Sequence, residues 1–194
     1  MGFEYCVRVV PYFGELEAGD GVVVWEAPQG LLVVVIDVLG HGQNAAQLAR
    51  QMEHYIQDKA SMDIEWLMSQ LHKYFIGSIG AAATMVFFNH ETMTFKGVGI
   101  GNTLLRKCAE PMQSFHAQPG VVGELLPTLR PFSSPFSSSE SYLFTTDGIK
   151  ENLDFDQLRG ACHGSLSHLA AFLIDNFSKR HDDATVIAVR YHDG

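Results

Sequence analysis

Two apolar runs separated by only two residues constrain this chain more than any other feature. Residues 21–27 (GVVVWEA) and 30–37 (GLLVVVID) are rich in β-branched side chains, and Pro28-Gln29 stands between them. So short a connection is typical of an antiparallel hairpin with a tight turn. Because both runs are apolar at successive positions, we expect other layers of the protein to cover both faces of these strands.

The predicted hairpin sets two carboxylates opposite each other. If the Pro-Gln pair forms the loop, Ala27 pairs with Gly30, and Asp20 then faces Asp37 on the same side of the sheet. Their Cβ atoms would be about 4.5–5.5 Å apart, where like charges repel unless a cation lies between them or one carboxylate is protonated. A β-bulge would shift the register and remove this pairing.

The remaining hydrophobic patterns predict blocks of strands and helices. Helical spacing predicts helices at 43–59, at about 62–75 with Ser61 as N-cap, and at 165–177. Further strands are expected at 3–13 (ending near Pro11), 81–88, 93–99, 103–107, 112–116, 141–145 and 184–191. The Pro-, Gly- and Ser-rich segment 117–139 is predicted to be irregular or mobile. This order favours an α+β fold of two packed antiparallel sheets with helices outside, in a single domain over residues 1–194.

Composition argues against several classes of function. The formal net charge is -9 and no cluster of Lys and Arg is present, so nucleic acid is not an expected partner. Three cysteines without a CxxC pair support neither a zinc knuckle nor a disulfide framework, so the reducing cytoplasm is the expected compartment. No segment approaches the length of an apolar transmembrane span, so no membrane association is expected.

Acidic residues recur where the predicted strands begin or end. Asp20, Asp37, Asp147 and the pair Asp182-Asp183 hold such positions. Oxygen ligands without nearby Cys or paired His favour magnesium, manganese or calcium, and carboxylates converging from distant segments suit a two-metal site. Taken singly, each has an ordinary interpretation: Asp37 could cap the next helix, Asp147 could form a turn, and one residue of the Asp pair could solvate a strand end.

Taken in order, these short motifs resemble one known family. They are Gly19-Asp20, the run 37–42 (DVLGHG), Gly101-Asn102, the run 146–149 (TDGI) with Glu151, and the run 182–185 (DDAT). The series resembles that of the PPM-type metal-dependent serine/threonine phosphatases, and more closely their SpoIIE-like bacterial branch. The resemblance runs from about Gly19 to Val189. In its small size the chain is similar to the feedback phosphatase of the stressosome.

The resemblance implies an α-β-β-α sandwich with two Mn²⁺ or Mg²⁺ ions in the cleft between the sheets. Asp37 would contact both ions, and the carbonyl of Val38 would bind one of them. Asp147 and Asp182 would hold the second ion, and Asp20 would hold the first through water. Asp37 and Asp147 would thus be the catalytic carboxylates. Five neighbours would shape the turns or hold these ligands in place: Gly40, His41, Gly42, Gly148 and Asp183.

Two features of the animal members of that family are absent from this sequence. Their histidine directly after the Asp-Gly pair is replaced by Leu39, and His41 is offset from that place. Their phosphate-binding arginine has no evident counterpart near the N-terminus. We therefore interpret His41 as a solvent-facing loop residue rather than as a proton donor.

The function that the resemblance implies is removal of phosphate from serine or threonine. The expected substrates are phosphorylated STAS-domain proteins of a bacterial stress-signalling complex, and the enzyme is expected to act as a monomer. Two alternatives stay open: a catalytically inert docking module with a phosphatase-like fold, and a metallohydrolase of small phosphate esters. The serine-rich segment 133–141 could be a flap, a regulatory phosphoacceptor or a linker, and we prefer the linker.

Overall fold

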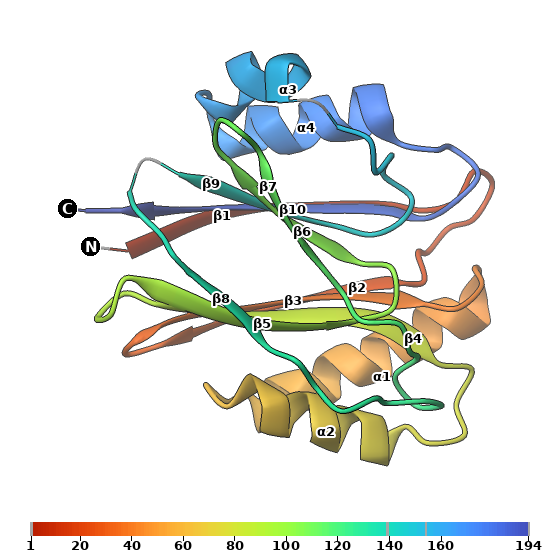
Figure 1. Ribbon diagram of the computed structural model, residues 1–194. Helices are drawn as coiled ribbons and strands as arrows, with labels where there is room; N and C mark the ends of the chain where they lie inside the picture. The colour runs from red at the N-terminus through yellow and green to blue at the C-terminus, as the bar shows by residue number, and fades with distance from the viewer. Residues whose placement is uncertain (1, 139, 154, 194) are drawn as a thin grey trace.

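Two antiparallel sheets lie face to face, and helices cover the outer face of each (Figure 1). This architecture comes from a computed structural model that describes residues 2–138, 140–153 and 155–193. It confirms the predicted α+β fold, an α-β-β-α sandwich. Met1 and Gly194 of the predicted single domain, and Ser139 of the serine-rich segment, lie outside the described residues.

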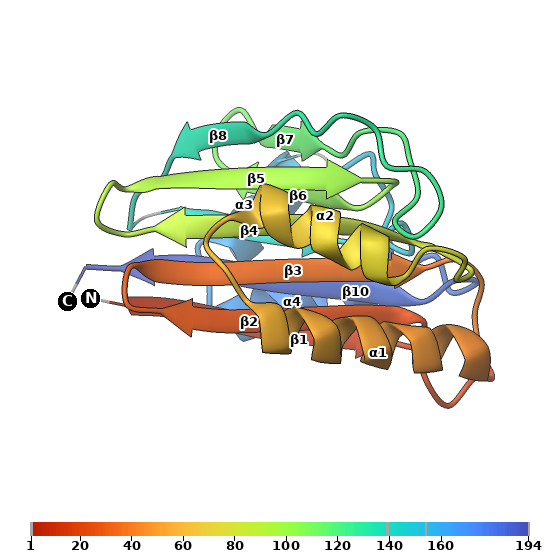
Figure 2. The same ribbon diagram turned by 90° about the horizontal axis from the view of Figure 1, so that it is seen from below.

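The first sheet contains the predicted hairpin at its edge. Its strand order is β2-β3-β4-β5-β8, with helices α1 and α2 against its outer face (Figure 2). The bounds are β2 Asp20–Ala27, β3 Gly30–Val38, α1 Gln43–Lys59, α2 Ile64–Tyr74, β4 Ala81–Asn89, β5 Thr94–Ile100 and β8 Phe132–Pro135.

The second sheet contains the first and the last strand of the chain, which pair with each other. Its strand order is β1-β10-β9-β6-β7, and α3 and α4 cover its outer face (Figure 1). The bounds are β1 Gly2–Val10, β6 Leu104–Cys108, β7 Gln113–His116, β9 Ser141–Thr145, α3 Phe155–Cys162, α4 Leu166–Phe177 and β10 Ala184–His192.

The β2–β3 hairpin has the predicted register. Ala27 pairs with Gly30, and the ladder continues without a bulge until Asp20 faces Asp37. On its other side β3 pairs with β4, so β3 lies inside the sheet. The side chains of residues 31–36 are fully buried. This explains the continuous apolar run, because one face of β3 packs on α1 and α2 while the other faces the second sheet.

Three apolar layers hold the sandwich together. One lies between the first sheet and its helices, one between the second sheet and its helices, and the third between the two sheets. The middle layer is aromatic: the ring of Phe88 lies 5.1 Å from that of Tyr142 and 5.3 Å from that of Phe95. The first contact is edge-on and the second is tilted, and aromatic contacts of this kind add to the free energy gained by burial. The two sheets are therefore held rigidly, and the loops at their ends are held with them.

Two elements were missed by the sequence patterns. The eight-residue helix α3 was not predicted, because it spans only about two turns and includes Gly160, a poor helix former. Strand β8 lies in the segment predicted to be irregular. It pairs with β5 at the sheet edge, where the Phe132 ring fills the space over Gly97; a Cβ there would lie 2.2 Å from the ring. Edge strands this short carry little pattern of their own.

The N-terminus of α2 also differs from the prediction. The cap is Asp63 rather than Ser61, and its carboxylate accepts a hydrogen bond from the Trp66 amide at 3.0 Å. The Ser61 hydroxyl instead accepts a hydrogen bond from the Asp63 amide at 3.1 Å. A charged carboxylate is the better partner for the positive end of the helix dipole, so the helix starts later than predicted.

Candidate active site

Asp20 is a buried carboxylate that links the two sheets. It is 8% exposed at the start of β2 and faces Asp37 at the end of β3. The hydroxyl of Thr146, just after β9 of the other sheet, donates a hydrogen bond to Asp20 Oδ2 at 2.9 Å. The same hydroxyl accepts a hydrogen bond from the Thr185 amide at 3.0 Å. Asp20 is therefore fixed from both sheets.

Asp183 organises the loop between β1 and β2. It is 4% exposed, and its two carboxylate oxygens accept hydrogen bonds from the backbone amides of Tyr12 and Gly19, each at 2.7 Å. Both oxygens of this buried carboxylate therefore have a backbone partner. The structure thus places Asp183 as the anchor of this loop, next to the residue that precedes Asp20.

Asp147 and Asp182 lie on two loops that approach each other closely. Asn102 Nδ2 donates a hydrogen bond to Asp147 Oδ2 at 2.6 Å. A Cβ on Gly148 would lie only 1.8 Å from the carbonyl oxygen of Asp183, so this position of the turn has no room for a side chain. Asp182 is half-buried, and its Oδ1 accepts a hydrogen bond from the backbone amide of Asp183 at 3.0 Å.

The carboxylates of this acidic cluster (Asp20, Asp37, Asp147 and Asp182) repel one another. Burial, followed by the charges of Asp20, Asp147 and Asp182, raises the pKa of Asp37 from 3.8 to about 8. Burial also raises the pKa of Asp20 to about 7, although a hydrogen bond from Thr146 partly offsets the rise. Burial and then Asp182 raise the pKa of Asp147. Burial and mutual repulsion therefore make Asp20, Asp37 and Asp147 costly to ionise.

The glycine turn after β3 leads directly into α1. Gly40 and Gly42 have φ values of 89° and 78°, in the left-handed region that favours glycine. His41 between them is exposed; its ring stacks on Tyr12 at 4.7 Å, and its Nδ1 lies 3.2 Å from a carboxylate oxygen of Glu15. The prediction that His41 is a surface loop residue agrees with this position. Val38 lies at the end of β3 with a buried side chain, and its amide donates to the carbonyl of Gly19 at 3.1 Å.

Comparison with known proteins identifies the fold through structure alone. No protein-family model and no curated protein sequence matches the chain. Among solved structures, RsbX in complex with magnesium superposes with a TM-score of 0.82 at 20% identity, covering 97% of this chain and 94% of RsbX. The Mycobacterium tuberculosis serine/threonine phosphatase PstP superposes with a TM-score of 0.76 at 11% identity over the full length of both chains.

This protein has the PPM-type phosphatase fold. A further match at a TM-score of 0.89 and 21% identity comes from a study of the bacterial stressosome as a modular system controlling secondary messenger signalling. It covers 98% of this chain and 100% of the other. At these identities the likeness establishes the fold and leaves the activity to be argued from the residues.

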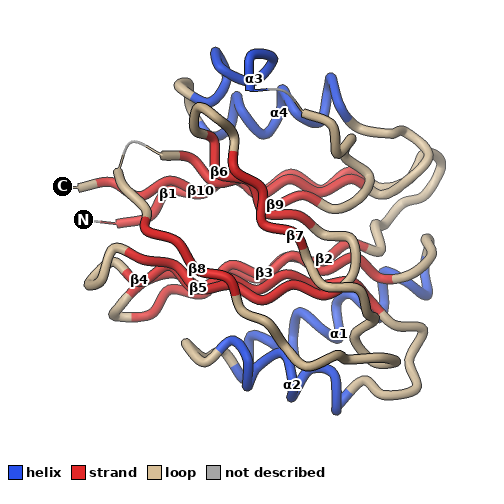
Figure 3. The backbone as a smooth tube through the Cα atoms, in the orientation of Figure 1, coloured by secondary structure: helices blue, strands red, loops and turns tan. Residues whose placement is uncertain are grey.

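The PPM-type fold gathers the acidic cluster at one end of the two sheets. Loops 11–19, 39–42, 101–103, 146–153 and 178–183 lie at this end (Figure 3). Asp37 Oδ2 is buried and has no hydrogen-bond partner. A buried, unpaired carboxylate oxygen is costly, and a divalent cation is a partner that would satisfy it and its acidic neighbours together. The all-oxygen donor set therefore fits Mg²⁺ or Mn²⁺.

The candidate metal ligands are not arranged tightly around a single point. Among the described residues, no group of three or more His, Cys, Asp and Glu side chains stands close enough together to hold a metal ion. In a separate respect, no helix among the described residues is long and apolar enough to cross a membrane.

Two contributors to the site were missed by sequence reasoning. Thr146 was noted only as part of a motif, yet it connects Asp20 to the second sheet. Lys179 gave no signal at all. Its amide donates to the Gly148 carbonyl at 2.7 Å, and its charge lowers the pKa of Asp147 against the larger effects of burial and Asp182. Among the residues that the structure describes, it is the one cation in the main electrostatic surroundings of Asp20, Asp37 and Asp147.

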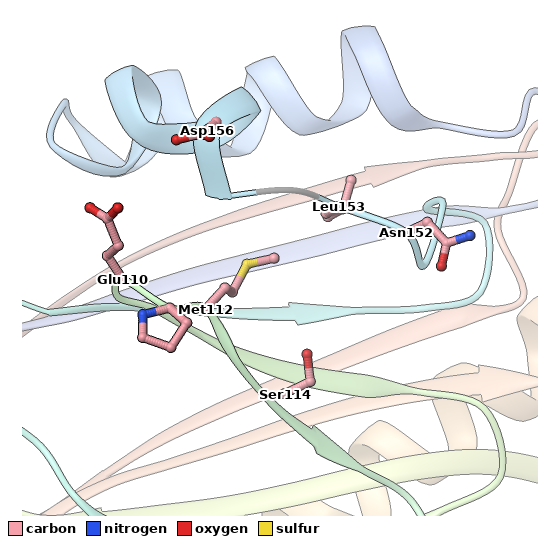
Figure 4. A pocket seen from close by; sticks show the side chains of 7 residues that line it. Glu110, Met112, Ser114, Asn152, Leu153 and Asp156 are labelled. Carbon is pink, nitrogen blue, oxygen red and sulfur yellow. The ribbon is translucent and has the colours of Figure 1, made fainter.

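A separate hollow lies away from the acidic cluster. It has a volume of about 640 Å³ and lies between the β6–β7 hairpin and the segment that leads into α3 (Figure 4). Glu110 and Asp156 line it, and both accept hydrogen bonds from Arg159, at 2.9 and 2.8 Å. No residue of the acidic cluster lines this hollow. Its acidic lining does not suit a phosphate group, so we do not place the active site there.

Proposed function

We propose that this protein is a Mg²⁺- or Mn²⁺-dependent phosphatase of phosphoserine and phosphothreonine in proteins. The observation that carries the proposal is the buried Asp37 oxygen that has no hydrogen-bond partner. Asp37 faces Asp20 across the hairpin, and the charges of Asp147 and Asp182 repel it. Asp37, Asp147, Asp182 and the Val38 carbonyl would hold two ions, and Asp20 would hold one of them through water. Such ions supply an activated water molecule and neutralise phosphate charge.

The residues of the chain have distinct tasks in this proposal. Asp37 and Asp147 provide the negative charge that would hold the metal ions, and Asn102 orients the Asp147 carboxylate through its 2.6 Å hydrogen bond. Thr146 orients Asp20 in the same way. Lys179 provides a positive charge close to Asp147, where the approaching phosphate brings negative charge. Water would attack phosphorus directly while the P–O bond to the serine or threonine oxygen breaks. A proton from the water ends on that oxygen, the products are inorganic phosphate and the free hydroxyl side chain, and no phosphorylated enzyme residue is expected.

The proposed substrates are phosphorylated STAS-domain proteins of a stress-signalling complex in the cytoplasm. Two observations support this choice. The motif series is closest to the SpoIIE-like branch, and two similar structures are RsbX and a protein from a study of the bacterial stressosome. We further propose that residues 1–194 act as one monomeric domain without nucleic acid or membrane.

The test is hydrolysis of phosphoserine and phosphothreonine peptides by the purified protein. We expect activity with Mn²⁺ or Mg²⁺, none with a chelator, and a loss of at least about a hundredfold in Asp37→Asn and Asp147→Asn. Asp58→Asn is the matched control, because Asp58 is an exposed acid at the end of α1. Activity that persists in the chelator would overturn the proposal. Binding of a phosphorylated STAS protein without turnover would favour the docking module, and turnover of small esters alone would favour the small-ester metallohydrolase.

A further inference from the structure

The loop between β1 and β2 presents two large apolar side chains to solvent beside the acidic cluster. Phe13 is 86% exposed and Leu16 is 96% exposed. The loop itself is well anchored: Asp183 accepts hydrogen bonds from the Tyr12 and Gly19 amides, and Tyr12 stacks on His41. An exposed aromatic side chain on a fixed loop is typical of a contact surface, because it offers apolar area with little conformational freedom to lose.

Phe13 borders a hollow that reaches the acidic cluster. We call it the Phe13 groove; its volume is about 320 Å³, and its lining includes Val10, Pro11, Phe13, Ile174, Arg180 and Asp182. These residues come from the end of β1, the end of α4 and the loop before β10 (Figure 1). Asp182 belongs to both the groove and the acidic cluster. A substrate bound at the cluster therefore has the groove as its immediate neighbour.

The groove carries charges of both signs, because Asp175 and Asp182 line it together with Arg180. Arg180 is exposed in its lining, and Lys179 precedes it beside Asp147. Among the described residues, neither side chain forms an ion pair, so both are free to face an anion. In a protein of net charge -9, two adjacent cations at this rim would offset repulsion of an incoming phosphate. The apolar part, Val10 and Phe13, lies beside them.

We propose that the Phe13 groove binds an apolar side chain close to the phosphorylated residue of a protein substrate. This inference rests on the proposed function and specifies its substrate: a polypeptide rather than a small phosphate ester. Successive residues of an extended chain are about 3.3–3.6 Å apart, so a residue two or three positions from the phosphate can reach a neighbouring groove. Burial of that side chain against Phe13 would provide affinity that the phosphate alone does not.

The experiment compares two phosphothreonine peptides that differ at the residues flanking the phosphate, which are Leu in one and Ser in the other. Wild-type protein with Mn²⁺ should prefer the Leu peptide. Phe13→Ala should raise KM for the Leu peptide on the order of tenfold with little change for the Ser peptide, because only the first loses an apolar contact. Phe13→Tyr should restore the preference, since it retains the ring.

The controls separate this inference from the proposed function. Tyr74→Ala removes an exposed aromatic residue, 68% exposed, from α2 on the outer face of the other sheet, and should keep the wild-type preference. Equal KM values of wild type and Phe13→Ala for the Leu peptide would refute binding of an apolar side chain in the groove. An equal rise in KM for both peptides would refute it as well. Inactivity of the wild-type protein on both peptides and on p-nitrophenyl phosphate would instead overturn the proposed function, and the groove with it.

Discussion

Asp37→Asn should make the metal-free protein less sensitive to pH. Because burial and neighbouring charges raise the folded-state pKa of Asp37 from 3.8 to about 8, the folded protein holds this proton more tightly than the unfolded chain. The resulting stability is complete at a pH below the unfolded-state pKa and is lost as pH rises towards the folded-state pKa. Asparagine cannot ionise, so the variant does not lose stability through position 37 as pH rises.

The size of the effect follows from the pKa. Between the two pKa values each pH unit removes about 1.4 kcal/mol per carboxyl group, so a rise from about pH 5.5 to about pH 7.5 removes about 3 kcal/mol through Asp37. In a chain of this length, about 1 kcal/mol changes Tm by roughly 2–4 °C. The wild-type Tm should therefore fall by about 6–12 °C more than that of Asp37→Asn over this range. Contributions from groups that the two proteins share cancel in the difference.

Thermal unfolding in chelator, followed by circular dichroism at both pH values, measures this difference. Mg²⁺ added at the higher pH should restore the wild-type Tm, because a cation binds the ionised cluster of the folded protein only; at a hundred times Kd the gain is about 2.7 kcal/mol. Asp37→Asn should gain much less. Parallel loss of Tm in the two proteins would refute the raised pKa, and an equal response to Mg²⁺ would refute Asp37 as a ligand.

Two further predictions concern neighbours of the cluster. Lys179→Met should weaken inhibition by inorganic phosphate several-fold because Lys179 is the cation beside Asp147, whereas the exposed Lys150→Met should not; equal inhibition constants would exclude the role. Gly148→Ala should destabilise the protein by about 2 kcal/mol or more, since its Cβ would lie 1.8 Å from a backbone oxygen. Gly160→Ala in α3 has open space and should be neutral or stabilising; similar denaturant midpoints for the two variants would contradict the close approach at the turn.

The sequence by itself determined the features that depend on neighbours along the chain. A two-residue loop between two β-branched runs defines the hairpin register, and this register alone places Asp20 opposite Asp37. The apolar spacing of residues 43–59 predicts helix α1 with the bounds that are observed. The order of the motifs predicts the α-β-β-α sandwich. The ligand roles of the predicted site residues stay predictions for the metal and activity experiments.

The tertiary structure alone decided how the two sheets meet. The Thr146 hydroxyl reaches Asp20 across 126 residues of sequence, and the carboxylate of Asp183 holds a loop that is 171 residues away at Tyr12. Lys179 approaches Asp147 only because its loop pairs with the turn at Gly148. Hydrophobic periodicity reports which face of an element is buried but not which distant loop lies beside it. That choice depends on how the aromatic layer packs the two sheets, which requires all the strands to be in place at once.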